Sequence, residues 1–317
     1  MDTRIYRQAM LSQTLLAASR SAKMRGFITG VPLTRRVVDR FVAGDNLDQA
    51  SLIISGLVDE GLAVTVDRLG EDTLDASDAA ATRDAYLEML KRFADLGIAH
   101  RTEVSLKLSA LGQKLPKDAE KIALENALAI AEAARDAGTT MTLDMEDHTT
   151  VDATLGALRD LRGDFPWVGV AIQAALFRTE GDIADLATAG SRIRLVKGAY
   201  MEPASVAHQD KHDVDKAYVR AMKTLMRSSA YPMIASHDQR MIDIAHALIA
   251  ETGREQDQQE FQMLHGIRTT EQQNLVAGGD TMRVYVPFGD DWYGYFMRRL
   301  AERPANVMFF LNSLVKR

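Results

Sequence analysis

VSLKLSALGQKLPKDAEKIALENALAIAEAARDAGTTMTLDM, residues 104–145, contains the repeating unit from which the fold can be inferred. The runs VSLKL (104–108) and MTLDM (141–145) are short and mostly apolar, as is typical of buried strands. Between them, residues 118–138 carry a helical pattern that stops at Gly138, where a C-terminal cap is expected. The stretch therefore predicts a strand, a helix and a second strand.

The same pattern recurs along the rest of the chain. The short apolar or β-branched runs are LAVTV (62–66), VSLKL (104–108), MTLDM (141–145), VGVAI (168–172), IRLV (193–196), PMIA (232–235), FQML (261–264) and MRVYV (282–286). Eight strand-helix units match the usual size of a (βα)8 barrel, whereas an open doubly wound sheet seldom needs so many similar units. We predict an α/β protein with a TIM-like barrel.

Three segments are expected. Residues 1–60 show no alternating strand pattern and are interrupted by glycine and proline, so we expect an N-terminal helical extension there. Residues 61–306 should form the barrel. Residues 307–317 are amphipathic and predict a C-terminal helical tail that docks onto the protein's own surface.

Composition excludes several classes of function. With 38 basic and 44 acidic residues the net charge is −6, and no basic cluster indicates a nucleic-acid partner. There are no cysteines, which excludes disulfides, Fe–S clusters, thiolate zinc sites and cysteine nucleophiles. No apolar run approaches the ~20 residues of a transmembrane segment, and the N-terminus lacks the apolar block of a signal peptide. We expect a cytoplasmic protein.

Polar side chains stand at or near the ends of the predicted strands. They are Asp67, Lys107, Asp144, Gln173, Arg194, Lys197, His237, His265 and Tyr285. Any one of them could be an ordinary solvated loop residue. Because barrel enzymes build their active sites at the C-terminal ends of the strands, eight such ends together favour a site.

Common cofactor motifs are absent, and one competing chemistry stays open. The chain contains no G-x-G-x-x-G after a strand, no P-loop and no H-E-x-x-H. His237, His265 and Asp144 lack the spacing of a metal site, so we expect no metal. Lys107 and Lys197 could each form a Schiff base, as in a barrel aldolase.

YGYFMRRLAERPAN, residues 293–306, places two adjacent arginines on an amphipathic helix. At about 100° per residue, one polar face is formed by Tyr295, Arg298, Arg299 and Glu302. On helix geometry alone, Arg298 and Glu302 are explained as a solvated i,i+4 pair, worth only ~0.3 kcal/mol.

Taken together, five strings resemble the proline dehydrogenase family, the flavin enzymes of proline catabolism. They are SLKLSALG (105–112), TLDMEDH (142–148), RLVKGAYME (194–202), EFQMLHGI (260–267) and YGYFMRRLAERPAN. The length is similar to that of the short monofunctional bacterial enzymes. The resemblance implies a distorted barrel with non-covalently bound FAD that oxidises L-proline to Δ1-pyrroline-5-carboxylate by hydride transfer. It also implies a membrane quinone as electron acceptor, peripheral contact with the inner membrane and pyrroline-5-carboxylate dehydrogenase as a candidate partner.

The resemblance also assigns roles to residues. For the substrate it implies the carboxylate ligands Arg298, Arg299 and Lys107, the lining tyrosines Tyr285 and Tyr295, a gate formed by Glu71 with Arg298, and Glu302 as the residue that orients an arginine. Around the flavin it implies Met145, Gln173, Arg194, Val196, Lys197, Gly198, Ala199, Tyr200, Lys211, Ser236 and His237. Arg194 is expected near the flavin N5, and Asp144 is expected to fix Arg194 or Lys107 beside the reacting centre.

Two further readings compete with this one. A flavin barrel of the methylenetetrahydrofolate reductase type would need a large pterin pocket and gives no reason for paired arginines. A non-catalytic barrel that serves as a binding module would be neither coloured nor active.

Overall fold

The computed structural model of the chain describes residues 38–302, and of residues 300–302 it describes the backbone alone. The helices expected before residue 38 and the tail expected at 307–317 therefore lie outside the described residues. The proposed division into segments at residues 60 and 306 stays a prediction.

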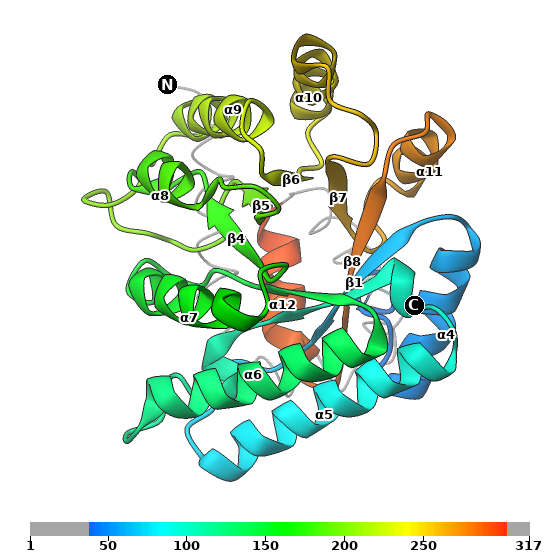
Figure 1. The fold of residues 1–317 in the computed structure, drawn as a ribbon, viewed down its shortest axis with the longest axis vertical. Helices are drawn as coiled ribbons and strands as arrows, with labels where there is room; N and C mark the ends of the chain where they lie inside the picture. The colour runs from blue at the N-terminus through cyan, green and yellow to red at the C-terminus, as the bar shows by residue number, and fades with distance from the viewer. Residues whose placement is uncertain (1–37, 303–317) are drawn as a thin grey trace, which may run out of the picture.

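Eight parallel strands close into a barrel in the order of the sequence (Figure 1). They are β1 (Ala63–Arg68), β2 (Thr102–Leu106), β3 (Thr140–Leu143), β4 (Gly169–Gln173), β5 (Arg192–Val196), β6 (Tyr231–Ala235), β7 (Glu260–Leu264) and β8 (Met282–Phe288). The barrel closes where β8 pairs with β1, with Val284 opposite Val64. The predicted barrel is confirmed, and each of the eight predicted runs overlaps one strand.

Helices surround the barrel between successive strands (Figure 1). They are α5 (Ala76–Asp95), α6 (Ala119–Ala137), α7 (Val151–Asp164), α8 (Thr179–Leu186), α9 (Lys211–Met226), α10 (Gln239–Thr252) and α11 (Thr269–Ala277). In addition, α4 (Leu47–Asp59) precedes β1, the short 3-10 helices η1 (Ala99–Arg101) and η2 (Leu108–Leu111) flank β2, and α12 (Trp292–Glu302) follows β8. Gly138 ends α6 with φ 74°, and its N–H reaches the carbonyls of Ala134 and Arg135, so the predicted cap is confirmed. Among the described helices, none is long and apolar enough to cross a membrane.

The strand predicted at 104–108 is shifted by two residues. β2 begins at Thr102 and ends at Leu106, and the backbone then enters η2 directly after Lys107. The apolar Leu108 is buried although it has left the strand, which is why the apolar run extended the prediction too far. Lys107 consequently lies at the rim of the barrel, where its side chain can enter a cavity.

The two faces of the barrel strands differ in polarity. Because successive strand residues alternate between faces, Val64 and Val66 of β1 pack outward under the helices while Thr65 faces inward. Arg194 of β5 bonds to Glu103 of β2, which lies across the barrel, so both side chains are inside. Barrel interiors are usually filled by branched apolar side chains. This one is largely filled by polar and charged ones.

α12 does not join the outer ring. Figure 1 shows it crossing the centre of the ring of helices. Its apolar face packs on residues that precede α4, where the rings of Phe41 and Phe296 lie 6.5 Å apart. Its polar face, with Tyr295 and the two arginines, is left to line the cavity described below. The helix is therefore amphipathic as predicted.

A buried tyrosine on α9 ties two strands together, which allows a test of the packing. The Tyr218 hydroxyl lies 3.1 Å from the Leu195 carbonyl and 3.2 Å from the Ala235 carbonyl. We expect Tyr218→Phe to lower the free energy of unfolding by about 1 to 3 kcal/mol, because buried carbonyls lose their donor. Thr224→Val on the exposed face of α9 is the control and should stay within about 0.5 kcal/mol. Urea denaturation measures both, and equal losses would contradict the assignment.

Candidate active site

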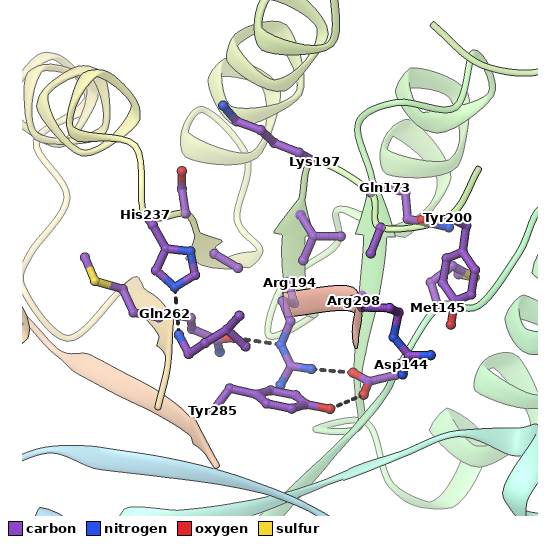
Figure 2. A pocket seen from close by; sticks show the side chains of 18 of the residues that line it. Asp144, Met145, Gln173, Arg194, Lys197, Tyr200, His237, Gln262, Tyr285 and Arg298 are labelled. Carbon is purple, nitrogen blue, oxygen red and sulfur yellow. Dashed lines mark hydrogen bonds and ion pairs between the residues drawn. The ribbon is translucent and has the colours of Figure 1, made fainter. Parts of the chain in front are cut away.

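A cavity of about 640 Å³ opens at the C-terminal ends of the strands, with α12 on one side. Figure 2 shows side chains from several strands and from α12 pointing into it. The residues singled out from the sequence that line it are Glu71, Lys107, Asp144, Met145, Gln173, Arg194, Val196, Lys197, Gly198, Ala199, Tyr200, Lys211, Ser236, His237, Tyr285, Tyr295, Arg298 and Arg299. Glu302 belongs to α12, but its side chain lies outside the described residues. Residues separated by more than 220 positions in the sequence, such as Glu71 and Arg299, therefore line the same cavity.

Arg194 forms the base of the cavity and is held from several directions (Figure 2). Its Nε donates to Gln262 Oε1 at 2.7 Å, and its Nη1 donates to Asp144 Oδ1 at 2.6 Å and to Ser105 Oγ at 2.8 Å. Its Nη2 donates to Glu103 Oε1 at 3.0 Å. Burial disfavours the charged form, but the carboxylates of Asp144 and Glu103 outweigh it and raise the pKa of Arg194. Arg194 is a fixed, permanently charged group.

Asp144 links Arg194 to a tyrosine. Tyr285 donates its hydroxyl proton to Asp144 Oδ2 at 2.6 Å (Figure 2). Burial, followed by the charge of Asp144, raises the pKa of Tyr285 far above its usual range, so the phenol stays protonated. The Lys107 ammonium is 3.6 Å from Asp144 Oδ2. Asp144 therefore contacts both of the cations that the sequence analysis offered as its partners.

Lys107 and Asp67 form a buried ion pair at 2.7 Å. The pKa of Asp67 is raised above its usual value, mainly by burial. Lys107 opposes this shift, whereas the negative charge of Asp144 adds to it. The pKa of Lys107 is nevertheless raised well above its usual value, because Asp67 and its neighbours outweigh the cost of burial. A Schiff-base lysine must lose its proton to react, so this environment disfavours aldolase chemistry at Lys107.

The polar face of α12 supplies two more cations. Arg298 Nη2 lies 2.7 Å from Glu71 Oε1, in the loop after β1. Burial opposes the charge of Arg298, but the Glu71 carboxylate raises the pKa of Arg298 above its usual value. The Arg299 guanidinium stands 4.9 Å from the centre of the Tyr295 ring and is buried. Arg298 is therefore not merely a solvated surface charge.

Small and polar groups line the outer part of the cavity. Lys197 pairs with Asp215 at 2.5 Å and Asp238 at 3.1 Å. His237 Nε2 accepts the Leu264 N–H at 2.9 Å, which leaves the ring proton on Nδ1. Gly198 has φ 117°, and a Cβ there would come within 3.2 Å of the Ala175 Cβ. The exposed Lys211 pairs with Asp215 at 3.1 Å.

Several lining residues were not predicted as site residues. Asp67 was noticed only as a strand-end residue, and the others are Ala171, Ala235, Asp238, Gln239, Gln262, Met263 and Leu264. The two-residue alternation in TEVSLK (102–107) and EFQML (260–264) could have shown that polar side chains share the inner face. His265, also at a strand end, is absent from the lining, and burial lowers its pKa. Within residues 38–302 no cluster of three or more acidic or histidine side chains is arranged to hold a metal ion.

Glu146, in the loop after β3, gives a test of the electrostatics beside the cavity. It accepts the Ser109 hydroxyl at 2.6 Å and the Ser109 N–H at 3.2 Å, and burial raises its pKa. A carboxyl with a raised folded pKa stabilises the fold below its unfolded pKa and loses that contribution as pH rises through the folded value. Because glutamine does not titrate, the Glu146→Gln variant should lack this loss of stability with rising pH. The free energy of unfolding of the variant should therefore increase relative to that of the native protein between pH 4 and pH 8. Urea denaturation at both pH values measures the difference, and a pH-independent difference would contradict burial as the cause.

Comparisons with known proteins identify the family of this chain. The family profile described as proline dehydrogenase matches residues 53–312. Proline dehydrogenase of Deinococcus radiodurans is 40% identical over 282 residues, which cover 88% of this chain and 90% of that protein. Proline dehydrogenase 2 of Bacillus subtilis is 38% identical over 284 residues, which cover 90% of this chain and 92% of that protein.

A solved structure shares the fold. Proline utilization A from Bdellovibrio bacteriovorus superimposes with a TM-score of 0.77 at 24% identity, over 84% of this chain. The match covers 32% of that longer chain, so this chain spans about a third of its length and the likeness concerns the fold alone. From the family profile and the two bacterial relatives, the chain belongs to the proline dehydrogenase family, whose members are oxidoreductases that act on CH–NH donors.

Proposed function

We propose that this protein oxidises L-proline to Δ1-pyrroline-5-carboxylate, using FAD held non-covalently in the cavity. The observation that carries the proposal is the convergence of three cations, Lys107, Arg298 and Arg299, on one cavity whose base is the charged Arg194. A small cyclic amino acid offers an anion for the first three and a ring to be oxidised beside the fourth. The proline dehydrogenase relatives support the choice of substrate.

The α12 arginines and Lys107 are proposed to bind the substrate carboxylate. A carboxylate offers about four acceptor sites, and guanidinium forks on adjacent residues satisfy more of them than one fork could. Tyr285 and Tyr295 place aromatic faces against the apolar ring. Glu71, which already pairs with Arg298, is proposed to act as a gate that closes the loop after β1 over the substrate. Glu302 remains the residue proposed to orient an arginine.

The donor set fits a flavin dinucleotide. The volume of the cavity lies in the range of sites for cofactors and small ligands, roughly 300 to 1,000 Å³. Arg194 supplies a cation for the ring, and Lys197, Lys211, Ser236 and His237 supply polar groups for the ribityl chain and phosphates. Gly198, with its positive φ, brings backbone rather than side chain to the cavity. Met145, Gln173, Val196, Ala199 and Tyr200 complete the proposed cofactor site.

The chain's own contribution to the reaction is positioning and charge. When bound, FAD supplies the acceptor for a hydride from the proline ring. Arg194 offers a positive charge that needs no rearrangement, because its acceptors already fix it. Asp144 holds Arg194 and the Tyr285 hydroxyl in one arrangement. The cations around the substrate lower the pKa of its ammonium group and so favour the neutral amine that must react.

The proposal also covers the acceptor of the electrons and the enzyme that uses the product. The motifs shared with the family support a membrane quinone as the electron acceptor, met by a cytoplasmic protein at the inner membrane surface. They also support pyrroline-5-carboxylate dehydrogenase as the enzyme that takes the product.

The visible spectrum tests the proposed function directly. Protein purified with added FAD should be yellow, and L-proline under anaerobic conditions should bleach the flavin band. Pyrrolidine, which has the ring but lacks the carboxylate, is the control and should bleach it far more slowly. A colourless protein after reconstitution, or equal bleaching by the two amines, would rule out the proposal.

Arg299 allows a test of carboxylate binding. Truncating one partner of a buried charge pair typically costs ~2 to 5 kcal/mol, so Arg299→Lys should raise the KM for proline about 30-fold or more. The control is Arg92→Lys on α5. This arginine pairs with the exposed Asp48 and does not line the cavity, so its replacement should leave the KM unchanged. Steady-state kinetics measure both. A native KM for Arg299→Lys would remove this residue from the substrate site.

A further inference from the structure

The barrel interior contains a network of buried charges at the N-terminal ends of the strands, beneath the cavity. We call it the barrel floor, and it consists of Glu103, Arg192, Glu260 and Arg283. Glu103 and Glu260 are almost completely buried. Of these four residues, none lines the cavity. The substrate and cofactor proposals therefore leave them without a role.

Glu103 connects the barrel floor to Arg194. Its Oε1 accepts from Arg194 Nη2 at 3.0 Å and from Thr65 Oγ1 at 2.6 Å. Its Oε2 accepts from Arg192 Nη2 at 3.0 Å and from Thr140 Oγ1 at 3.2 Å. One carboxylate thus bridges two arginines that would otherwise repel each other. Burial opposes its ionisation, but Arg283, Arg192 and Arg194 hold the pKa of Glu103 well below its usual range.

Charges inside the barrel are balanced. The cations are Lys107, Arg192, Arg194 and Arg283, and the carboxylates that pair with them are Asp67, Asp144, Glu103 and Glu260. In a medium of low dielectric constant, a unit charge interacts strongly with other charges several ångströms away. Loss of one carboxylate would leave a net positive charge whose effect depends on its distance from Arg194.

We propose that Glu103 is a positioning residue that fixes the Arg194 guanidinium from the barrel floor, partly neutralises it, and thereby sets the reduction potential of the flavin. This inference rests on the proposed function, because it requires a flavin in the cavity. Reduction adds negative charge to the flavin, so an arginine that is less neutralised favours the reduced form. Glu103 acts on the cofactor only through Arg194.

Glu260 is a matched control within the same network. It is also a buried carboxylate and pairs with Arg283 at 2.8 Å and Arg192 at 3.9 Å. Its link to Arg194 is indirect, through Gln262, whose amide donates to Glu260 and whose oxygen accepts from Arg194. Glu103→Gln and Glu260→Gln therefore remove the same charge at different distances from the guanidinium.

The experiment measures flavin midpoint potentials of the FAD-loaded protein and its variants. Glu103→Gln should shift the equilibrium toward reduced flavin at least tenfold, which is about 30 mV for a two-electron couple. Glu260→Gln should shift it in the same direction by clearly less. An unchanged potential in Glu103→Gln, or an equal shift in both variants, would overturn the inference.

Glu103→Asp covers the case in which Glu103→Gln does not fold. It keeps the charge but shortens the side chain, so it should leave the potential near the native value while slowing flavin reduction by proline at least tenfold. A native rate in Glu103→Asp would overturn the positioning role. The proposed function fails separately: a native protein that binds no FAD, or whose flavin is not reduced by proline, overturns both proposals before any variant is measured.

Discussion

The contact between Arg194 and Asp144 is the interaction on which the candidate site depends. It joins β5 to the end of β3 across the interior, at 2.6 Å and with almost no solvent. Each partner has further bonds, Arg194 to Gln262, Ser105 and Glu103, and Asp144 to Tyr285. An arginine buried without these acceptors would be very costly. The strands must therefore close in this register for the charge to be tolerated.

The polar interior has a consequence for the architecture. A barrel packed with branched apolar side chains gains stability from its interior, whereas this one must satisfy every buried charge there. The apolar contribution comes instead from the layer between strands and helices, where Val64, Leu106 and Leu195 are fully buried. The interior is thus available for chemistry, while the stability of the fold resides in the outer layer.

The placement of α12 completes the cavity. Because its apolar face packs on Phe41 and Leu69 at the barrel mouth, its polar face is directed at the strand ends rather than at solvent. The Glu71–Arg298 ion pair joins this helix to the loop after β1. The side of the cavity where we propose that the substrate carboxylate binds is therefore built from the first and last parts of the barrel.

The sequence by itself determined the number of strand-helix units, the cap at Gly138, the amphipathic nature of the last helix and the polar residues at the strand ends. It could do so because periodicity and capping are local properties, readable within about ten to twenty residues. The family motifs added proposed roles for residues such as Arg298 and Lys107, and these roles stay predictions. The exact end of β2 was missed, because the buried Leu108 continues the apolar run beyond the strand.

Only the tertiary structure decided which side chains meet. The pairs Glu103–Arg194 and Glu71–Arg298 are 91 and 227 residues apart in the chain. Strand alternation tells which face a side chain occupies, but barrel closure determines which residue lies opposite. The charge state of Lys107 also depends on the tertiary structure. Nothing in the neighbouring sequence distinguishes Lys107 from a reactive lysine, and its buried contact with Asp67 keeps it protonated. Electrostatic energy depends on distance in space, and that distance exists only once the barrel has closed.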